Sequence, residues 1–229
     1  MHIEVVDFVA GARAARGTTV VIDVFRAFSV EAYAFARGAV ASIPVADVET
    51  ARQLKADDTN RILLGERHAR PLPGFDCGNS PAELERLEIA GRTLVHTTHS
   101  GTQGLANALG ADDVITGALV NCAAIVRYIK ACKPKYVTLV RMGHEARERC
   151  DEDDLCAELI AARLRGAELD VSYVRDRLRM ASSARKFFDP DCTWAPERDF
   201  ELCTAVDIFD FVLRLDRTVN PAILRRVDV

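Results

Sequence analysis

The stretch TTVVIDV, from Thr18 to Val24, decides the fold class of this chain. It opens with five consecutive β-branched residues, and such a run is typical of a strand that is buried on both faces. The segment AFSVEAYAFARG, from Ala27 to Gly38, follows with apolar residues at helical spacing and a glycine at its end. A buried strand followed at once by a helix predicts a β–α unit.

The same order of strand and helix recurs up to residue 167. Further strands are predicted over residues 40–46, 61–66, 92–98, 112–119 and 136–142, and further helices over residues 48–56, 81–89, 100–110, 121–131 and 151–166. Ser80 and Pro81 suit the cap and the first position of one of these helices. Six β–α pairs predict an α/β fold with a mainly parallel sheet, which could be mixed, flanked by helices.

The C-terminal portion has a different pattern. Residues 171–188 are polar with helical spacing, residues 196–208 begin with a proline and predict a helix, and residues 209–215 predict a closing strand. No linker or repeat separates this helical portion from the rest of the chain. We therefore expect one domain over residues 1–229, with a small C-terminal lobe from about residue 168 as the alternative.

The composition limits the kinds of partner. The chain has 229 residues, 49% hydrophobic content and a net charge of −4 from 30 basic and 34 acidic residues that are mixed along the sequence. The absence of a basic stripe argues against nucleic acid. No secretory leader pattern and no apolar run long enough to span a bilayer occurs, so we expect a cytoplasmic protein without a membrane partner. Apolar helix faces could serve the core or a homodimer interface.

Seven cysteines raise the question of metal or thiol chemistry. Their number is odd and no C-x-x-C pair occurs, so neither a disulfide framework nor a cysteine zinc site is predicted. Cys77 has Glu83 where a phosphate-cradling C-x5-R loop needs arginine, and thiol catalysis is not expected. The histidines, among them His68 and His99, include no pair at H-x-x-x-H spacing. This argues against a zinc site.

The residues that follow each predicted strand are the candidates for a site, because ligands of parallel sheets bind outside the carboxyl ends of the strands. Asp23 and Arg26 follow the first of these strands. Asp23 could simply cap the next helix, with Arg26 as its ion-pair partner. A carboxylate in this position, three residues from an arginine, also suits metal binding or phosphate chemistry.

Two predicted helix starts allow a similar choice. The segment TTHSGT, from Thr97 to Thr102, could be an ordinary capped start, or its small residues could offer N–H groups to an anion. The segment DEDDLC, from Asp151 to Cys156, could compensate the helix dipole, or Glu152 and Asp153 could supply oxygen ligands to Mg²⁺. Asn121 follows another predicted strand on the same edge.

The segment ERHARPLPGFDCGNSPAEL, from Glu66 to Leu84, places many ionisable groups on a loop that is too long for a simple turn. Loops of this length without structure of their own are often functional. We expect its glycines and prolines to shape and stiffen the backbone. Glu66, Asp76 and Asn79 are then expected to face a ligand.

Common phosphate-binding motifs are missing, and no second aspartate stands two places after Asp23. Several segments together nevertheless resemble the 2-phosphosulfolactate phosphatase family over nearly the whole chain. These segments are VVIDVFRA (20–27), LLGER with PGFDCGNSP (63–81), TLVHTTHSGT (93–102), TGALVNCAAI (116–125), EDDLCAELI (152–160) and DFELCTAVDIFDFV (199–212). The resemblance implies Mg²⁺-dependent hydrolysis of a small anionic phosphate monoester such as 2-phospho-3-sulfolactate, linked to coenzyme M and sulfolactate pathways.

The chain departs from the family pattern at four places. The family commonly has T-T-x-N-G-T where this chain has Ser100, and a glycine-rich step where it has His68 and Ala69. It also has small residues where this chain has RMG at 141–143, and a glycine where it has Glu158. These changes add bulk or polarity near the expected pocket, so the chemistry could be retained while the substrate differs.

The chemistry of a phosphate monoester suggests roles for the candidates, because its dianion needs charge neutralisation and an aligned attacking group. Catalytic roles are predicted for Asp23, Arg26 and Glu66. Mg²⁺ ligands are predicted among Asp23, Glu66, Asp76, Glu152 and Asp153. Substrate contacts are predicted for Arg67, Asn79, Ser80, Thr98, Ser100, Gly101, Thr102 and Asn121. The attacking group could be metal-activated water, or Asp23 forming an aspartyl phosphate.

Two other functions remain open on sequence alone. The first is a metal-dependent lyase or aldolase that acts on a small organic acid. The second is a non-catalytic anion-binding or regulatory protein, which the four departures make conceivable. The joint presence of Asp23, Arg26, Glu66 and Asp76 weighs against the second.

Overall fold

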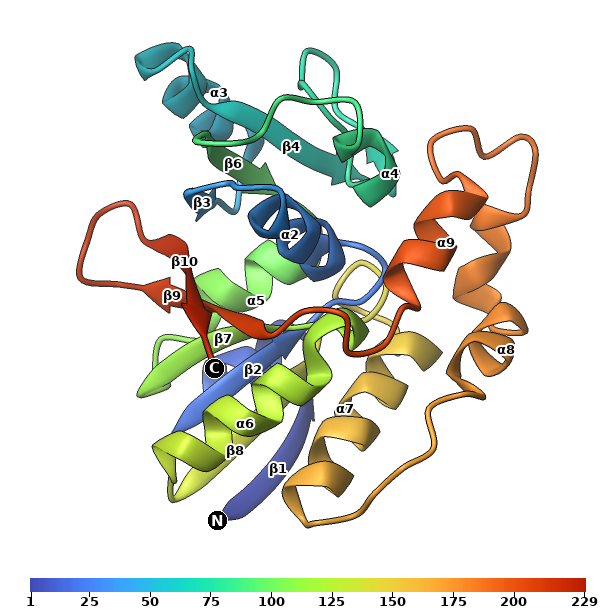
Figure 1. Ribbon diagram of the computed structural model, residues 1–229. Coiled ribbons are helices and arrows are strands. Elements are labelled where there is room, and N and C mark those ends of the chain that lie inside the picture. Colours follow the sequence, from blue (N-terminus) through green and yellow to red (C-terminus); the bar gives the residue numbers. More distant parts are fainter.

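A ten-stranded mixed sheet forms the centre of the protein in the computed structural model, which describes residues 1–229 (Figure 1). The strands are β1 (His2–Asp7), β2 (Thr18–Ile22), β3 (Ala41–Pro44), β4 (Ile62–Arg67), β5 (Arg70–Pro71), β6 (Thr93–Thr97), β7 (Asp113–Gly117), β8 (Tyr136–Arg141), β9 (Phe211–Asp216) and β10 (Ile223–Asp228). Their order in the sheet is β1-β8-β2-β7-β9-β10-β3-β6-β4-β5. The predicted α/β class is confirmed.

The sheet consists of two parallel halves. In the first half, β1, β8, β2 and β7 run parallel, and in the second half β3, β6 and β4 run parallel. The antiparallel hairpin of β9 and β10 lies between them, joined to each half by a short antiparallel pairing. In Figure 1 the two halves form the upper and lower parts of the molecule, with the hairpin in red at their junction. The sheet is therefore mainly parallel but mixed.

Helices follow the parallel strands as predicted. They are α1 (Phe8–Ala14), α2 (Ala27–Ala36), α3 (Val48–Asp57), α4 (Pro81–Leu84), α5 (Gly101–Asn107), α6 (Cys122–Cys132), α7 (Asp151–Leu164), α8 (Val174–Arg179) and α9 (Glu197–Cys203), with 3-10 turns η1 (Leu119–Asn121) and η2 (Ser182–Phe187). Ser80 caps α4, since its hydroxyl accepts a hydrogen bond from the Glu83 N–H at 3.1 Å. All six predicted β–α pairs are present.

Some predicted elements differ in extent. The helix predicted over residues 81–89 ends at Leu84, and the region 171–188 forms two short helical pieces, α8 and η2. The β1–α1 pair and strand β10 were not predicted. Only Leu224 is buried in β10, and no residue of β1 is fully buried. Their apolar pattern is therefore too weak to be recognised from sequence.

Strand β2 lies in the middle of the first half and is buried throughout. Val21 packs into one large apolar cluster, while Val20 and Ile22 pack into another. This alternation is expected when successive side chains of a strand point to opposite faces. The prediction of a strand buried on both faces is confirmed.

The C-terminal helices pack onto the second of these clusters through Leu178, Phe187 and Phe200. The chain then returns to the middle of the sheet as β9 and β10. The number of domains stays a prediction, although the C-terminal strands are part of the common sheet. None of the helices has both the length and the apolar content needed to cross a membrane.

Candidate active site

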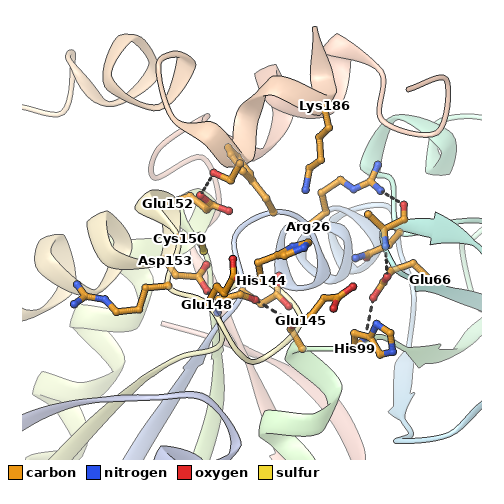
Figure 2. A pocket seen from close by; sticks show the side chains of 18 of the residues that line it. Arg26, Glu66, His99, His144, Glu145, Glu148, Cys150, Glu152, Asp153 and Lys186 are labelled. Atoms are coloured by element: carbon orange, nitrogen blue, oxygen red, sulfur yellow. Dashed lines mark hydrogen bonds between the residues drawn. The ribbon is translucent and has the colours of Figure 1, made fainter. Parts of the chain in front are cut away.

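A cavity of about 300 Å³ lies where loops from both halves of the sheet meet at the carboxyl ends of the parallel strands. The loops after β2 and β8 line it from one half, and the loops after β4 and β6 line it from the other. Figure 2 shows Glu152 and Asp153 on one side of this cavity, Glu66 and His99 on the opposite side, and Lys186 reaching in between them. Seven predicted site residues line it: Asp23, Arg26, Glu66, Asn79, Ser100, Glu152 and Asp153.

Asp23 binds two backbone N–H groups from different elements. Its Oδ1 atom accepts from Ala27 at 3.2 Å, and its Oδ2 atom accepts from Gly101 at 2.8 Å. The bond to Ala27 holds the first residue of α2, although Arg26 rather than Asp23 occupies the N-cap position. Asp23 also lines the cavity, while its role in metal binding or phosphate chemistry stays a prediction.

Glu66 and Asp153 follow the same pattern. Glu66 accepts N–H bonds from His99 and Ala69, each at 2.8 Å. Asp153 accepts N–H bonds from Val24 and Gly143, each at 2.8 Å. Each carboxylate thus braces two loops with two of its roughly four lone-pair sites. The remaining sites are available to a cation.

Two glycines beside the cavity allow close approaches, Gly101 to the Asp23 carboxylate and Gly143 to the backbone of Glu148. A Cβ atom on Gly101 would lie 2.9 Å from Asp23 Oδ2. Gly143 has φ +63°, and a Cβ atom there would lie 2.2 Å from the Glu148 carbonyl oxygen. Any side chain at either position would displace a loop that holds the site.

The carboxyl groups of the cavity carry negative charge that the protein does not fully compensate. Burial and the charge of Glu66 raise the pKa of Asp23 to about 6, although N–H bonds from Ala27 and Gly101 oppose the shift. Burial, together with the charges of Asp23 and Glu152, raises the pKa of Asp153 well above its usual value. Perturbed pKa values of this kind are typical of functional sites.

Glu152 shows the same behaviour on the other side of Asp153. Burial raises its pKa, although the Ser183 hydroxyl opposes this by donating a 2.5 Å hydrogen bond to Oε2. Glu152 and Asp153 lie in the first turn of α7 and are both buried. The acidic start of α7 therefore contributes to the cavity as well as to the helix dipole.

Arg26 is held by a residue that sequence reasoning missed. Its guanidinium donates to Asp199 Oδ2 at 2.6 Å and to the Trp194 carbonyl oxygen at 2.8 Å. The Arg26 and Asp199 side chains are only 2% and 0% exposed. Asp199, rather than Asp23, is thus the ion-pair partner of Arg26. No sequence signal links these two positions, because the contact joins α9 to the loop after β2.

Ser80 belongs to this structural network rather than to the cavity lining. Its hydroxyl donates to Asp199 Oδ1 at 2.8 Å, and the side chain is fully buried. The N–H of Ala82 donates to the same oxygen at 2.9 Å. Ser80 therefore positions Arg26 through Asp199 and caps α4, instead of contacting a substrate.

Lys186 is a second residue of the cavity that the sequence did not reveal. It comes from η2, reaches into the cavity in Figure 2, and has no hydrogen-bond or ion-pair partner in the protein. Burial lowers its pKa and the charge of Arg26 adds to the effect, while Glu152 and Asp23 oppose it. Since η2 lies in the polar C-terminal region, no strand-end rule could have identified this lysine.

Asp76 does not lie with the other predicted Mg²⁺ ligands. It lies outside the cavity, where its Oδ2 atom accepts the Leu63 N–H at 2.8 Å and pairs with Lys55 at 3.1 Å. The loop after β4 carries it back along the strand, where Cys77 bridges to Leu64. Asp76 therefore ties the loop to β4, while Glu66 and Asn79 from the same loop reach the cavity.

Arg67 and Asn121 also have structural partners outside the cavity. Arg67 donates to Thr97 Oγ1 at 2.8 Å and to the Ala46 carbonyl oxygen at 3.1 Å. Asn121 is buried and donates to the Phe211 carbonyl oxygen at 3.3 Å. Neither side chain lines the cavity. Arg67 and Asn121 therefore do not lie with the predicted site residues that line it.

The first two N–H groups of α5 donate to protein side chains, one to a carboxylate and one to a hydroxyl. The N–H of Gly101 is taken by Asp23, and the N–H of Thr102 donates to Thr98 Oγ1 at 3.2 Å. Thr98, Gly101 and Thr102 are buried outside the cavity lining, whereas Ser100 lines it. The N–H groups of Gly101 and Thr102 are therefore not free for an anion, while the substrate contact of Ser100 stays a prediction.

The departures from the family pattern lie at different distances from the cavity. Ser100 and Ala69 line it, but Glu158 is exposed on α7 and Met142 is buried in the core. Arg141 pairs with acidic residues outside the cavity. The expectation that all four changes crowd the pocket is thus wrong for the change at Arg141 and Met142 and for the change at Glu158.

Thiol chemistry has no support in the cavity. All seven cysteines are free, and Cys150 is the one that lines the cavity. Burial and the negative charges of Asp153 and Glu152 raise the pKa of the Cys150 thiol. The thiolate is the nucleophilic form, so a protonated Cys150 is a poor nucleophile.

The donor set of the cavity fits a hard divalent cation such as Mg²⁺. Six carboxyl groups line the cavity against three lysine or arginine side chains. The amide Oδ1 of Asn79 is buried there without a partner. Mg²⁺ takes oxygen ligands, keeps several waters and needs only one or two protein carboxylates. Asp23, Glu66 and Asp153 have free lone pairs to offer.

Comparison with known proteins identifies the family of this chain. A sequence model of the family described as 2-phosphosulpholactate phosphatase matches residues 5–218. The chain belongs to this family. A protein of Thermotoga petrophila named "Probable 2-phosphosulfolactate phosphatase" is 34% identical over 207 residues, which are 85% of this chain and 87% of the relative.

Other members of the 2-phosphosulpholactate phosphatase family carry the same name. The protein of Caldanaerobacter subterraneus is 34% identical over 214 residues, 86% of each chain, and that of Clostridium tetani is 40% identical over 121 residues, 52% of each chain. Family membership confirms the resemblance seen in the sequence. It also confirms the predicted enzyme class, a phosphoric monoester hydrolase of the 2-phosphosulfolactate phosphatase type.

Proposed function

We propose that this protein is a Mg²⁺-dependent phosphatase that hydrolyses the phosphate monoester of a small 2-phospho acid, 2-phospho-3-sulfolactate or a close relative. The observation that carries this proposal is the arrangement of Arg26 and Lys186 above buried carboxylates in one cavity of about 300 Å³. A volume at the lower end of the range for ligand pockets suits a small ligand. Family membership supports the reaction class.

A bound cation would make the charges of the cavity more favourable to a polyanionic substrate. The lining carries three more acidic groups than lysine and arginine groups, and each of these carboxyl groups that is ionised opposes the binding of a phosphate, carboxylate or sulfonate. A Mg²⁺ ion held by Asp23, with Glu66 or Asp153, would neutralise charge on the phosphate oxygens and polarise the phosphorus centre. This explains how an acidic cavity can accept an acidic substrate.

The protein groups then have separate tasks. Arg26 is fixed by Asp199 and holds phosphate oxygens, and the unpaired Lys186 ammonium binds a second anionic group. Attack on phosphorus comes from a water molecule that gives its proton to an ionised carboxylate of the cavity, and the bond between phosphorus and the ester oxygen breaks. In the alternative, Asp23 attacks and a water molecule then hydrolyses the aspartyl phosphate to free phosphate and Asp23. The departing alkoxide takes a proton, for which Glu152, with its raised pKa, is the candidate donor.

A phosphate-release assay on a panel of small esters tests this function. The panel includes 2-phospho-3-sulfolactate, 2-phospholactate and a larger sugar phosphate, each with Mg²⁺ and with a chelator. We expect inorganic phosphate from the two small acids with Mg²⁺, and none with the chelator. Consumption of the acids without phosphate release would indicate a lyase, and no turnover with any ester would contradict the proposal.

Replacing Lys186 with methionine is expected to raise the KM for the small phospho acid by about 10- to 100-fold, because a hydrogen bond to a charged group contributes about 1.5–3 kcal/mol. The protein should remain folded, since Lys186 makes no hydrogen bond or ion pair. The K186R variant retains the charge and is expected to retain most of the affinity. Steady-state kinetics of both variants measure the effect, and an unchanged KM in K186M would remove Lys186 from the substrate site.

The stabilising effect of Mg²⁺ is expected to grow with pH. The raised pKa of Asp23 means that its contribution to stability is complete below about pH 4 and is lost as the pH rises through about 6 in the metal-free protein. Mg²⁺ binds the ionised form and so reverses this loss. The rise in Tm caused by Mg²⁺ should therefore be larger at pH 7.5 than at pH 5. An equal or larger rise at pH 5 would contradict binding by these carboxylates.

A further inference from the structure

Three potential metal ligands gather beside the cavity although no spacing in the sequence indicates them. His68 follows β4, His99 follows β6 and Glu145 follows β8. Their ligand atoms all lie within 4.8 Å of one another, and no other such group of His, Cys, Asp and Glu exists in the protein. No three of the buried carboxylates Asp23, Glu66, Glu152 and Asp153 have ligand atoms within this distance of one another. This cluster is therefore distinct from them.

We propose that His68, His99 and Glu145 bind a divalent transition-metal ion of the zinc type at the solvent-exposed side of the cavity. Two imidazoles and one carboxylate are a set that Zn²⁺ and similar borderline ions prefer, whereas Mg²⁺ prefers oxygen ligands alone. Three protein ligands leave one position for water or another ligand. His99 and Glu145 line the cavity, so this position is accessible from it.

The contacts within the cluster show that each ligand atom can be released to a metal. His68 Nδ1 lies 2.6 Å from Glu145 Oε1, a hydrogen bond in which Nδ1 carries the proton and the carboxylate accepts it. A metal ion bound by both atoms would replace this proton. The His68 side chain is 72% exposed and can adjust its position. His99 Nδ1 accepts only a 3.3 Å bond from the His68 N–H, which a metal could replace.

The backbone holds the ligands in place on two anchored loops. His68 and Glu145 have φ angles of 54° and 51°, in the left-handed region that residues other than glycine rarely adopt. Each loop is tied by its next residue, because the Ala69 N–H donates to Glu66 and the Ala146 N–H donates to Ser100. Burial lowers the pKa of His99, although Glu66 opposes this, and favours the neutral imidazole that binds metals.

Titration of the chelator-stripped protein with Co²⁺, followed by competition with Zn²⁺, tests the site without any substrate. We expect one Co²⁺ per chain, with ligand-field absorption and no thiolate charge-transfer band. The H68G and E145Q variants should bind at least about tenfold more weakly. H68G places glycine at a left-handed position, so it is expected to fold at least as well, and its Tm provides the check.

Two variants serve as controls for this experiment. H2Q removes an exposed histidine far from the cluster, on β1, and D23N removes a carboxylate proposed for Mg²⁺. Both should bind Co²⁺ as the unmodified protein does, and excess Mg²⁺ should not displace it. Unchanged affinity in H68G and E145Q, a thiolate band, or displacement by Mg²⁺ would each overturn the proposal. The phosphate-release assay tests the proposed function separately, because Co²⁺ binding is measured without turnover.

Discussion

The D23N variant is expected to release phosphate from the small 2-phospho acid at least about 1,000-fold more slowly than the unmodified protein. Asp23 is buried at the end of β2, lines the cavity and has lone pairs left after its two N–H bonds. Asparagine has the same shape, but it lacks the charge that a metal ligand or a nucleophile needs. Single-turnover phosphate release with Mg²⁺ measures the effect.

The D76N variant is the matched control for this experiment. Asp76 comes from the loop that also supplies Glu66, and the sequence predicted it as a ligand, but the structure places it outside the cavity beside Lys55. We expect D76N to retain the phosphatase rate. If D76N lost activity while D23N retained it, the assignment of the cavity as the active site would be wrong.

The D199A variant is expected to lose about 3–5 kcal/mol of unfolding free energy, because it leaves the buried Arg26 charge without its partner. The two side chains are 2% and 0% exposed, so solvent gives no screening. Arg26 also loses its fixed position, and phosphate release should fall with it. Urea unfolding followed by the fluorescence of Trp194, the single tryptophan, measures the loss.

A double variant separates the structural part of this effect from the catalytic part. R26M/D199A removes the charge together with its partner, and such replacements often restore stability. We therefore expect it to be more stable than D199A, while phosphate release stays lost because Arg26 is absent. A D199A protein as stable and active as the unmodified one would show that Asp199 does not position Arg26.

The parts of the fold that the sequence predicts are those with strong local patterns. Residues 18–22 are β-branched and buried on both faces, and Ser80 with Pro81 starts a helix by its cap chemistry. The half-exposed β1 and the arginine-containing β10 have no such pattern. Since β10 and β9 join the two halves of the sheet, the strand order was also not predictable.

The sequence predicts those residues of the candidate site that lie at the carboxyl ends of strands or at the following helix start. Asp23, Glu66 and Asp153 were found because they stand at carboxyl ends of strands or at the following helix start. Asp199 and Lys186 come from the C-terminal helical portion and reach the site only through tertiary packing. Asp76 and Arg67 were wrongly included in the converging set, because sequence proximity to Glu66 does not determine the direction of a side chain.

Three carboxylates of the cavity each have two tasks. Glu66, Asp23 and Asp153 each hold two loops together through backbone N–H groups, and they also face the cavity. The same bonds that brace the loops fix the carboxylates before a ligand arrives. Such preorganisation reduces the cost of ordering a metal and a substrate at the moment of reaction.

A crystal structure of the protein with Mg²⁺ and inorganic phosphate, the expected product, tests the central claim most directly. The account predicts a phosphate ion within hydrogen-bond distance of Arg26, and a Mg²⁺ ion bound to an oxygen of Asp23 and at least one further carboxylate of the cavity. Phosphate and Mg²⁺ bound elsewhere on the protein, with no phosphate contact from Arg26, would contradict it.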